Sequence, residues 1–259
     1  HELNHEGKYF KVKGPLNLPR TPQGRPVIAQ AGSSEVGIKF AARCADMIFT
    51  AQSTIPEGQA FYRKVKDQVA SFGRNPDHVK IMPGLMPILG ATREEAQETY
   101  DKLVSMTSDE VSIRSLNHYS GGIDLTKLDP DMILPELPPA NTAKARQDLI
   151  VAKAKQENWT IRQTAQFVAV AQGHHTVVGS AADVADLMQD WLDNDACDGF
   201  MLMSPFYPVP LERIVDHLVP ELQRRGIFRT EYEGTTLRDS LGIPVPENRY
   251  TAMARSKAS

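Results

Sequence analysis

The amino-acid sequence predicts an α/β protein with a parallel sheet, on three observations. Four short apolar segments of β character alternate along the chain with segments whose apolar residues recur at helical spacing. The first apolar segment leads through a glycine into a serine-capped helix start, as βα junctions do. The chain has 259 residues, 41% of them hydrophobic, which is enough for a large core. Such alternation favours parallel strands joined by right-handed crossovers.

The first 26 residues lie outside this alternation. Tyr9, Phe10 and Val12 stand among lysines and predict one short edge strand. Prolines at 15, 19, 22 and 26 then mark an extended connection. The chain opens on His1 instead of an initiator methionine. We therefore expect that the N-terminal part of a longer protein is missing.

The first strand–helix unit contains a candidate anion site. Val27–Gln30 predicts a strand, Ala31 and Gly32 end it, and Ser33 or Ser34 can cap a helix that runs to Cys44. Backbone N–H groups, the helix dipole and two hydroxyls would together favour a phosphate. An ordinary βα turn with a capping serine has the same residues, so both interpretations stay open here. The expected apolar face of this helix consists of Val36, Phe40, Ala41 and Cys44.

The next units follow the same alternation. Apolar and helical spacing predict a strand over 45–50, a helix over 56–72, a third strand over 79–89 and a helix from the capping box at 92–95 to about residue 104. Because Pro83 and Pro87 lack an N–H group, we expect the third strand to be broken at both.

Residues 105–159 interrupt the regular pattern. This stretch contains turns, a glycine pair and a proline cluster, with one helical piece from Thr142 to Glu157. A long irregular segment inside an α/β domain is typical of a functional insertion or lid. Regularity then resumes with helices over 160–172 and from Ser180, a fourth strand over 197–203 and a last helix over 211–223. Four strands cannot close a barrel, so the chain is either a small open sheet or the C-terminal half of a larger barrel, which its abrupt start favours.

Several functional classes are disfavoured by composition. A net charge of −3 gives no electrostatic footprint for nucleic acid or an anionic membrane. No segment approaches the roughly 18 apolar residues of a membrane span. Cys44 and Cys197 are expected to be buried thiols in a reducing cytoplasm. No cluster has zinc-ligand spacing, and the adjacent His174 and His175 point to opposite sides of an extended segment, so we expect no metal.

Several motifs together carry a family resemblance. They are the segments 14–26, 29–37, 178–186, 198–200 and 219–238, which read GPLNLPRTPQGRP, AQAGSSEVG, VGSAADVAD, DGF and VPELQRRGIFRTEYEGTTLR. In combination they resemble the bacterial-luciferase-like flavin monooxygenases, in the branch of nitrilotriacetate, dibenzothiophene-sulfone and long-chain alkane monooxygenases. The resemblance extends from about Gly7 to Leu241.

The resemblance implies a TIM-like (β/α)8 barrel that binds FMN at the C-terminal ends of its strands. The chain is similar to the C-terminal half of that barrel, as one domain over 1–259 whose insertion, 105–159, covers the pocket. Ala31, Gly32, Ser33 and Ser34 would then hold the FMN phosphate. His118 or Tyr119, in the insertion, would face substrate or flavin. The residues around the flavin ring would lie N-terminal to His1, and no catalytic residue can be named.

The function implied is a two-component monooxygenase in the cytoplasm. It would use O2 and reduced FMN, supplied by a separate NAD(P)H:flavin reductase, to oxygenate an organic or xenobiotic substrate. A homodimer or larger assembly is the usual expectation for such barrels. Two alternatives remain: a truncated barrel that binds flavin without catalysis, and a deazaflavin-dependent reductase of the same superfamily.

Overall fold

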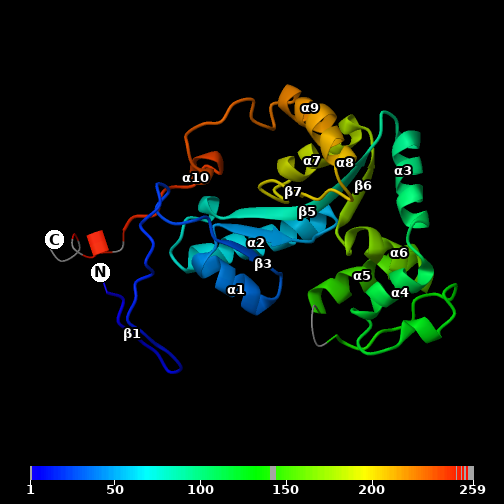
Figure 1. Ribbon diagram of the computed structural model, residues 1–259, viewed down its shortest axis with the longest axis horizontal. Helices are drawn as coiled ribbons and strands as arrows, with labels where there is room; N and C mark the ends of the chain where they lie inside the picture. The colour runs from blue at the N-terminus through cyan, green and yellow to red at the C-terminus, as the bar shows by residue number, and fades with distance from the viewer. Residues whose placement is uncertain (1, 141–143, 249, 252, 254, 256–259) are drawn as a thin grey trace. The chain divides into compact units, whose positions relative to one another are not determined.

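The computed structural model describes residues 2–140, 144–248, 250, 251, 253 and 255, and divides into two compact units. One unit comprises His1–Val27 and Glu233–Ser259, and the other comprises Ile28–Tyr232. The larger unit contains the sheet and the helices around it (Figure 1). In the part of the chain that is described, no helix combines the length and apolarity needed to cross a membrane.

The smaller unit is organised by a hairpin and a buried arginine. Strands β1 (His5–Glu6) and β2 (Lys11–Val12) pair antiparallel, so the expectation of one edge strand was wrong: the exposed Tyr9 and Phe10 lie in the turn. Arg238, in the short helix α10 (Leu237–Ser240), is 2% exposed and donates hydrogen bonds to backbone carbonyls of both chain segments, those of residues 25, 26 and 244. Arg238 thus ties the two segments of this unit together.

The larger unit contains one parallel sheet of five strands, which confirms the predicted class. Its strands are β3 (Ala29–Ala31), β4 (Met47–Thr50), β5 (Lys80–Leu89), β6 (His175–Gly179) and β7 (Met201–Leu202). The long β5 pairs with β4 along its first half, with β6 along its second half and with β7 at residues 84 and 85. Strand β6 was missing from the sequence prediction, because its five residues continue directly from the preceding helix and turn.

The two prolines do not break β5, which contradicts the expectation. Ile81 and Leu85 accept hydrogen bonds from the Asp198 and Met203 N–H groups, on the side of β5 that faces β7. Side chains and backbone groups alternate along a strand, so the backbone nitrogens of residues 83 and 87 face the same side as those of 81 and 85. Strand β7 has only two residues, so it requires no donor at either proline.

Helices α1 (Glu35–Cys44) and α2 (Ile55–Ser71) pack on one face of β4 and β5. Ser34 is the N-cap of α1, and its hydroxyl accepts the Gly37 N–H at 3.1 Å. The apolar face predicted for this helix was partly wrong: Val36 and Phe40 are 80% and 60% exposed. The buried face consists of Ile38, Ala41 and Ala42. The short turn η1 (Pro76–His78) joins α2 to β5.

The chain between β5 and β6 forms a helical subregion with its own core. That core comes from α4 (Asp109–Asn117), the turn η2 (Leu125–Lys127), α5 (Lys144–Glu157) and α6 (Ile161–Ala171), whereas α3 (Arg93–Ser105) packs mainly on β5 and β6; all these helices lie at the right of Figure 1. Helix α4 lies in the stretch that was expected to be irregular, and Ser108 caps it by accepting the Val111 N–H. The predicted helix start at Thr142 lies outside the described residues.

After β6, helix α7 (Ala181–Asp193) and a continuous helix over 209–224 cover the same face of β5 farther along the strand, where Leu85 and Leu89 follow Ile81 on that face. That helix consists of α8 (Val209–Arg213), the π-helical turn η3 (Ile214–Leu218) and α9 (Val219–Arg224). The Val219 N–H bonds to the carbonyl of Ile214, five residues back. This wider turn lets the helix pass Pro220, whose ring would clash with a carbonyl in a regular turn.

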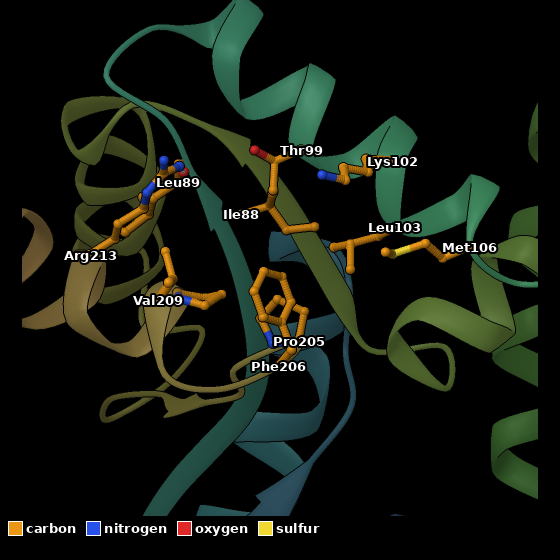
Figure 2. A pocket seen from close by; sticks show the side chains of 11 residues that line it. Ile88, Leu89, Thr99, Lys102, Leu103, Met106, Pro205, Phe206, Val209 and Arg213 are labelled. Carbon is orange, nitrogen blue, oxygen red and sulfur yellow. Dashed lines mark hydrogen bonds between the residues drawn. The ribbon is translucent and has the colours of Figure 1, made fainter.

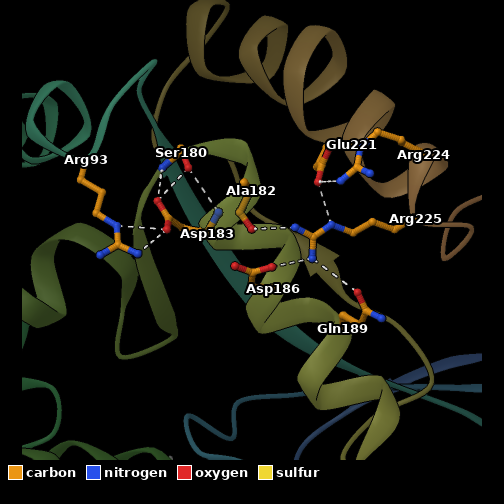
Figure 3. A network of polar contacts seen from close by, with 9 residues as sticks. All are labelled: Arg93, Ser180, Ala182, Asp183, Asp186, Gln189, Glu221, Arg224 and Arg225. Atoms are coloured by element: carbon orange, nitrogen blue, oxygen red, sulfur yellow. Dashed lines mark hydrogen bonds and ion pairs between the residues drawn. The ribbon is translucent and has the colours of Figure 1, made fainter.

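A polar network joins these helices (Figure 3). Asp183 and Ser180 form a capping box, with Asp183 accepting the Ser180 N–H at 2.9 Å, and Arg93 of α3 forms an ion pair with the same carboxylate. Arg225 bridges Asp186 at 2.6 Å and Glu221 at 2.8 Å. Asp186 therefore pairs with an arginine, and the network fixes α7 against its neighbours.

Candidate functional site

The predicted phosphate turn lies at the C-terminal end of β3. Gly32 has a φ of +123°, a conformation that side-chain-bearing residues rarely adopt. Ser33 follows half-buried, and Ser34 caps α1. Because the first N–H groups of a helix lack partners within it, those of α1 are directed at this turn. The chain therefore has the geometry of an anion site at a helix N-terminus.

The turn opens onto a cavity of ≈ 680 Å³. Its wall comes from the turn, the end of β4, the start of α2 and helix α5 of the insertion, through Ala31, Gly32, Ser33, Phe49, Thr50, Ala51, Gln52, Glu57, Ala60, Arg146, Asp148, Leu149 and Ala152. Arg146 is half-buried, and burial lowers the pKa of its guanidinium. The cavity thus combines a turn that favours anions with a cation from the insertion.

A buried histidine lies next to this cavity. His174 is 4% exposed, and its ring packs on Phe49, a cavity residue, with ring centroids 5.1 Å apart. Its Nε2 is 3.0 Å from Nη2 of Arg146. Burial, and secondarily the Arg146 charge, lower the pKa of His174 to about 4. His175 points the other way and packs on Trp191, as the alternation of an extended segment predicts.

Sequence reasoning considered His174 only as a metal ligand and missed this position. The available signal was a histidine at the start of an apolar strand, and recognising it required β6. The part of the chain that is described contains no cluster of three or more His, Cys, Asp or Glu side chains that could hold a metal ion.

The predicted substrate residues lie elsewhere in the insertion. His118 is exposed at the end of α4, with Nδ1 3.2 Å from the Ser115 carbonyl oxygen. Tyr119 is half-buried against the core of the insertion, and its carbonyl accepts a hydrogen bond from Gln147. Neither belongs to the cavity lining given above, so their contact with a ligand stays a prediction.

A second cavity of ≈ 510 Å³ lies between α3, the end of β5 and the segment that follows β7 (Figure 2). Its wall is mostly apolar, with Leu103, Met106 and Phe206 among the lining residues. Arg213 also lines it but is engaged by Glu95 at 2.6 Å and by the Leu89 carbonyl. This cavity suits an apolar group, whereas the first has a mixed polar wall with Arg146, Glu57 and Asp148.

Comparison with known proteins agrees with this architecture. The sequence model described as luciferase-like monooxygenase matches residues 1–195. The chain is 49% identical to N-acetyl-S-(2-succino)cysteine monooxygenase of Bacillus subtilis (strain 168) and 45% identical to nitrilotriacetate monooxygenase component A of Aminobacter aminovorans. Each match covers 96% of this chain, and 57% and 55% of the respective relatives.

Among solved structures, riboflavin lyase (RcaE) with modified FMN and its substrate riboflavin is similar to this chain, with a TM-score of 0.77 and 29% identity. That match covers 95% of this chain and 54% of the other. The chain thus spans about half the length of the curated relatives it matches, and its parallel sheet corresponds to part of a TIM-like barrel. The chain belongs to the luciferase-like monooxygenase family.

Proposed function

We propose that this chain forms the FMN-phosphate-binding part of a two-component monooxygenase. One observation carries the proposal: the turn from Ala31 to Ser34 joins β3 to a helix N-terminus and opens onto a cavity that also holds Arg146. Reduced FMN, when bound, would supply the chemistry that activates O2 for insertion into an organic substrate.

The residues present fit the phosphate of such a cofactor. Gly32 lacks a side chain, so a ligand can approach the backbone closely, and the N–H groups of Ser33 and Ser34 and of the first turn of α1 would donate to phosphate oxygens. The apolar atoms of Phe49 and Leu149 would exclude water from the adjoining part of the cavity. His118 and Tyr119 belong to the proposal as substrate contacts, with the insertion 105–159 as the cover of the pocket in a single barrel domain.

The proposal extends to partners. An NAD(P)H:flavin reductase would supply reduced FMN, consistent with a relative whose name designates it component A of its enzyme. A homodimer or larger assembly working in the cytoplasm completes the proposal. Sedimentation of the purified chain, with and without FMN, tests the assembly.

The first test is fluorescence titration of the chain with FMN, beside a Ser33→Ala/Ser34→Ala double variant and a Ser115→Ala control. Ser115 lies on α4 outside the cavity lining. We expect FMN to bind the wild-type chain and the control, and the double variant to bind at least ten-fold more weakly. No binding by the folded wild-type chain would contradict the proposal for these residues, and preference for a deazaflavin over FMN would favour the reductase alternative.

A further inference from the structure

The ring of His174 is held between an arginine and a glycine. On one side its Nε2 lies 3.0 Å from Nη2 of Arg146, which also donates through Nη1 to the Gln172 carbonyl at 2.8 Å. On the other side, Nδ1 lies beside Gly84 of β5. Phe49 of β4 packs on the ring and also lines the cavity of the phosphate turn.

The contact with Arg146 fixes the protonation of this ring. A guanidinium has only hydrogen-bond donors, so Nε2 must accept with its lone pair. A doubly protonated imidazolium has no such lone pair, and a neutral imidazole that accepts at Nε2 carries its proton on Nδ1. Arg146 is the charge that faces the ring, while β4 and β5 present Phe49 and Gly84 to it.

The Nδ1–H group that results has no hydrogen-bond partner among the described residues, although it is buried. Buried donors are nearly always paired, so an unpaired one indicates a site for an incoming acceptor. The space beside it depends on Gly84, because a Cβ there would lie 2.6 Å from Nδ1 and 2.9 Å from Cε2 of Phe49. Gly84 and Phe49 therefore enclose this donor, and Phe49 is the residue that contacts both the His174 ring and the cavity.

We propose that Arg146 is a positioning residue that holds His174 neutral with its proton on Nδ1, preset to donate to a carbonyl oxygen or ring nitrogen of the molecule in the adjoining cavity. The identification of that molecule as a flavin rests on the proposed function. Because Arg146 belongs to α5, the insertion would control the donor that the sheet presents.

A purely structural role for Arg146 makes a different prediction. Its bond to the Gln172 carbonyl could merely fasten α5 to the turn before β6. Loss of that fastening would lower stability without selecting a tautomer of His174. The tautomer is therefore the quantity to measure.

The experiment is NMR of the whole chain with ¹⁵N-labelled histidine, with the His174 signals assigned by their absence in His174→Gln. In the wild-type chain we expect a proton on Nδ1 and no titration between pH 5 and 8. Arg146→Met should raise the midpoint and bring in the Nε2–H tautomer, while Arg146→Lys, also only a donor, should restore the wild-type pattern. Arg162→Met is the matched control, since Arg162 of α6 pairs with Asp131 at 2.9 Å.

The His175 signals serve as an internal reference and should not change in any variant. A wild-type proton on Nε2, or an unchanged tautomer in folded Arg146→Met, would overturn the inference. Addition of FMN separates it from the proposed function. If FMN binds without moving the Nδ1 signal, the ligand contact is wrong, whereas absence of FMN binding with the expected tautomers refutes only the flavin assignment.

Discussion

Replacing Asp198 by alanine tests whether a buried ion pair holds α2 to the sheet. The Asp198 carboxylate accepts from Lys66 at 3.0 Å, from the Tyr62 hydroxyl at 3.1 Å and from the Ile81 N–H at 2.8 Å. The side chains of Lys66 and Asp198 are only 12% and 15% exposed. Burial, together with the Asp198 charge, raises the pKa of Tyr62, so its hydroxyl remains a donor at all ordinary pH values.

The magnitude follows from what the substitution leaves behind. Removing one partner of a buried ion pair costs about 3–5 kcal/mol of unfolding free energy. Lys66 keeps two carbonyl acceptors, those of Pro76 at 3.0 Å and Val79 at 2.8 Å. We therefore expect Asp198→Ala to cost about 3 kcal/mol, the lower end of that range.

The assay is urea unfolding followed by tryptophan fluorescence, since Trp159 and Trp191 both lie in the larger unit. Arg114→Ala is the control, because its pair with Glu110 is 70% exposed on both sides and should contribute less than about 0.5 kcal/mol. The double variant Lys66→Met/Asp198→Ala should cost less than the sum of the single variants. An Asp198→Ala cost no greater than that of the control would refute the reasoning.

Three further predictions concern packing and pH. Gly84→Ala should cost about 1–3 kcal/mol of unfolding free energy in urea, because the new Cβ would crowd the His174 ring; a neutral result would show that the ring has room to move. The pKa of His174 is about 4 in the folded chain, below the ordinary ~6.5 of the unfolded chain. Between pH ~4 and ~6.5 the unfolded chain therefore binds more protons than the folded chain, and the free energy of unfolding rises with pH across this range. His174→Gln should remove about half of this rise, since His175 has a similarly lowered pKa; an unchanged pH profile of urea midpoints would contradict this. Hydrogen bonds from Arg224 and Arg225 lower the pKa of Glu221 to about 2, so the ionised Glu221 side chain stabilises the folded chain above about pH 4.3 and this stabilisation is lost as pH falls towards 2. Glu221→Gln should therefore flatten the acid side of the same profile of urea midpoints. An equally steep acid side in the variant would contradict this prediction.

The sequence predicted most of the larger unit because its signals are local. The Ser180–Asp183 capping box and the apolar spacing in α2 and α7 need only neighbours within a turn of helix. The predictions were wrong where contacts with residues distant in the sequence determine the local structure. Val36 and Phe40 have the right spacing for a buried face, but the sheet covers the side with Ile38 instead. Pro83 and Pro87 look like breaks until the shortness of β7 is known.

The candidate site shows the same division. The turn over residues 31–34 could be located from a few consecutive residues, because a strand, a glycine and a capping serine suffice to specify it. The Arg146–His174 pair could not, because its members are 28 positions apart and meet only when α5 and β6 pack on the sheet.

The segment between β5 and β6, which includes the insertion, leaves and rejoins the sheet on neighbouring strands. The chain departs after Leu89 of β5 and returns at His175 of β6, and these strands pair directly, with Leu89 opposite Gly179 and His175 opposite Leu85. The ladder between β5 and β6, not the intervening helices, therefore holds the two ends at a fixed spacing. Exchange of this segment between relatives would change the wall of the cavity without disturbing the register of the sheet. The fold thus provides a natural boundary for chimeras, in which a new cavity wall can be joined to an unaltered turn between β3 and α1.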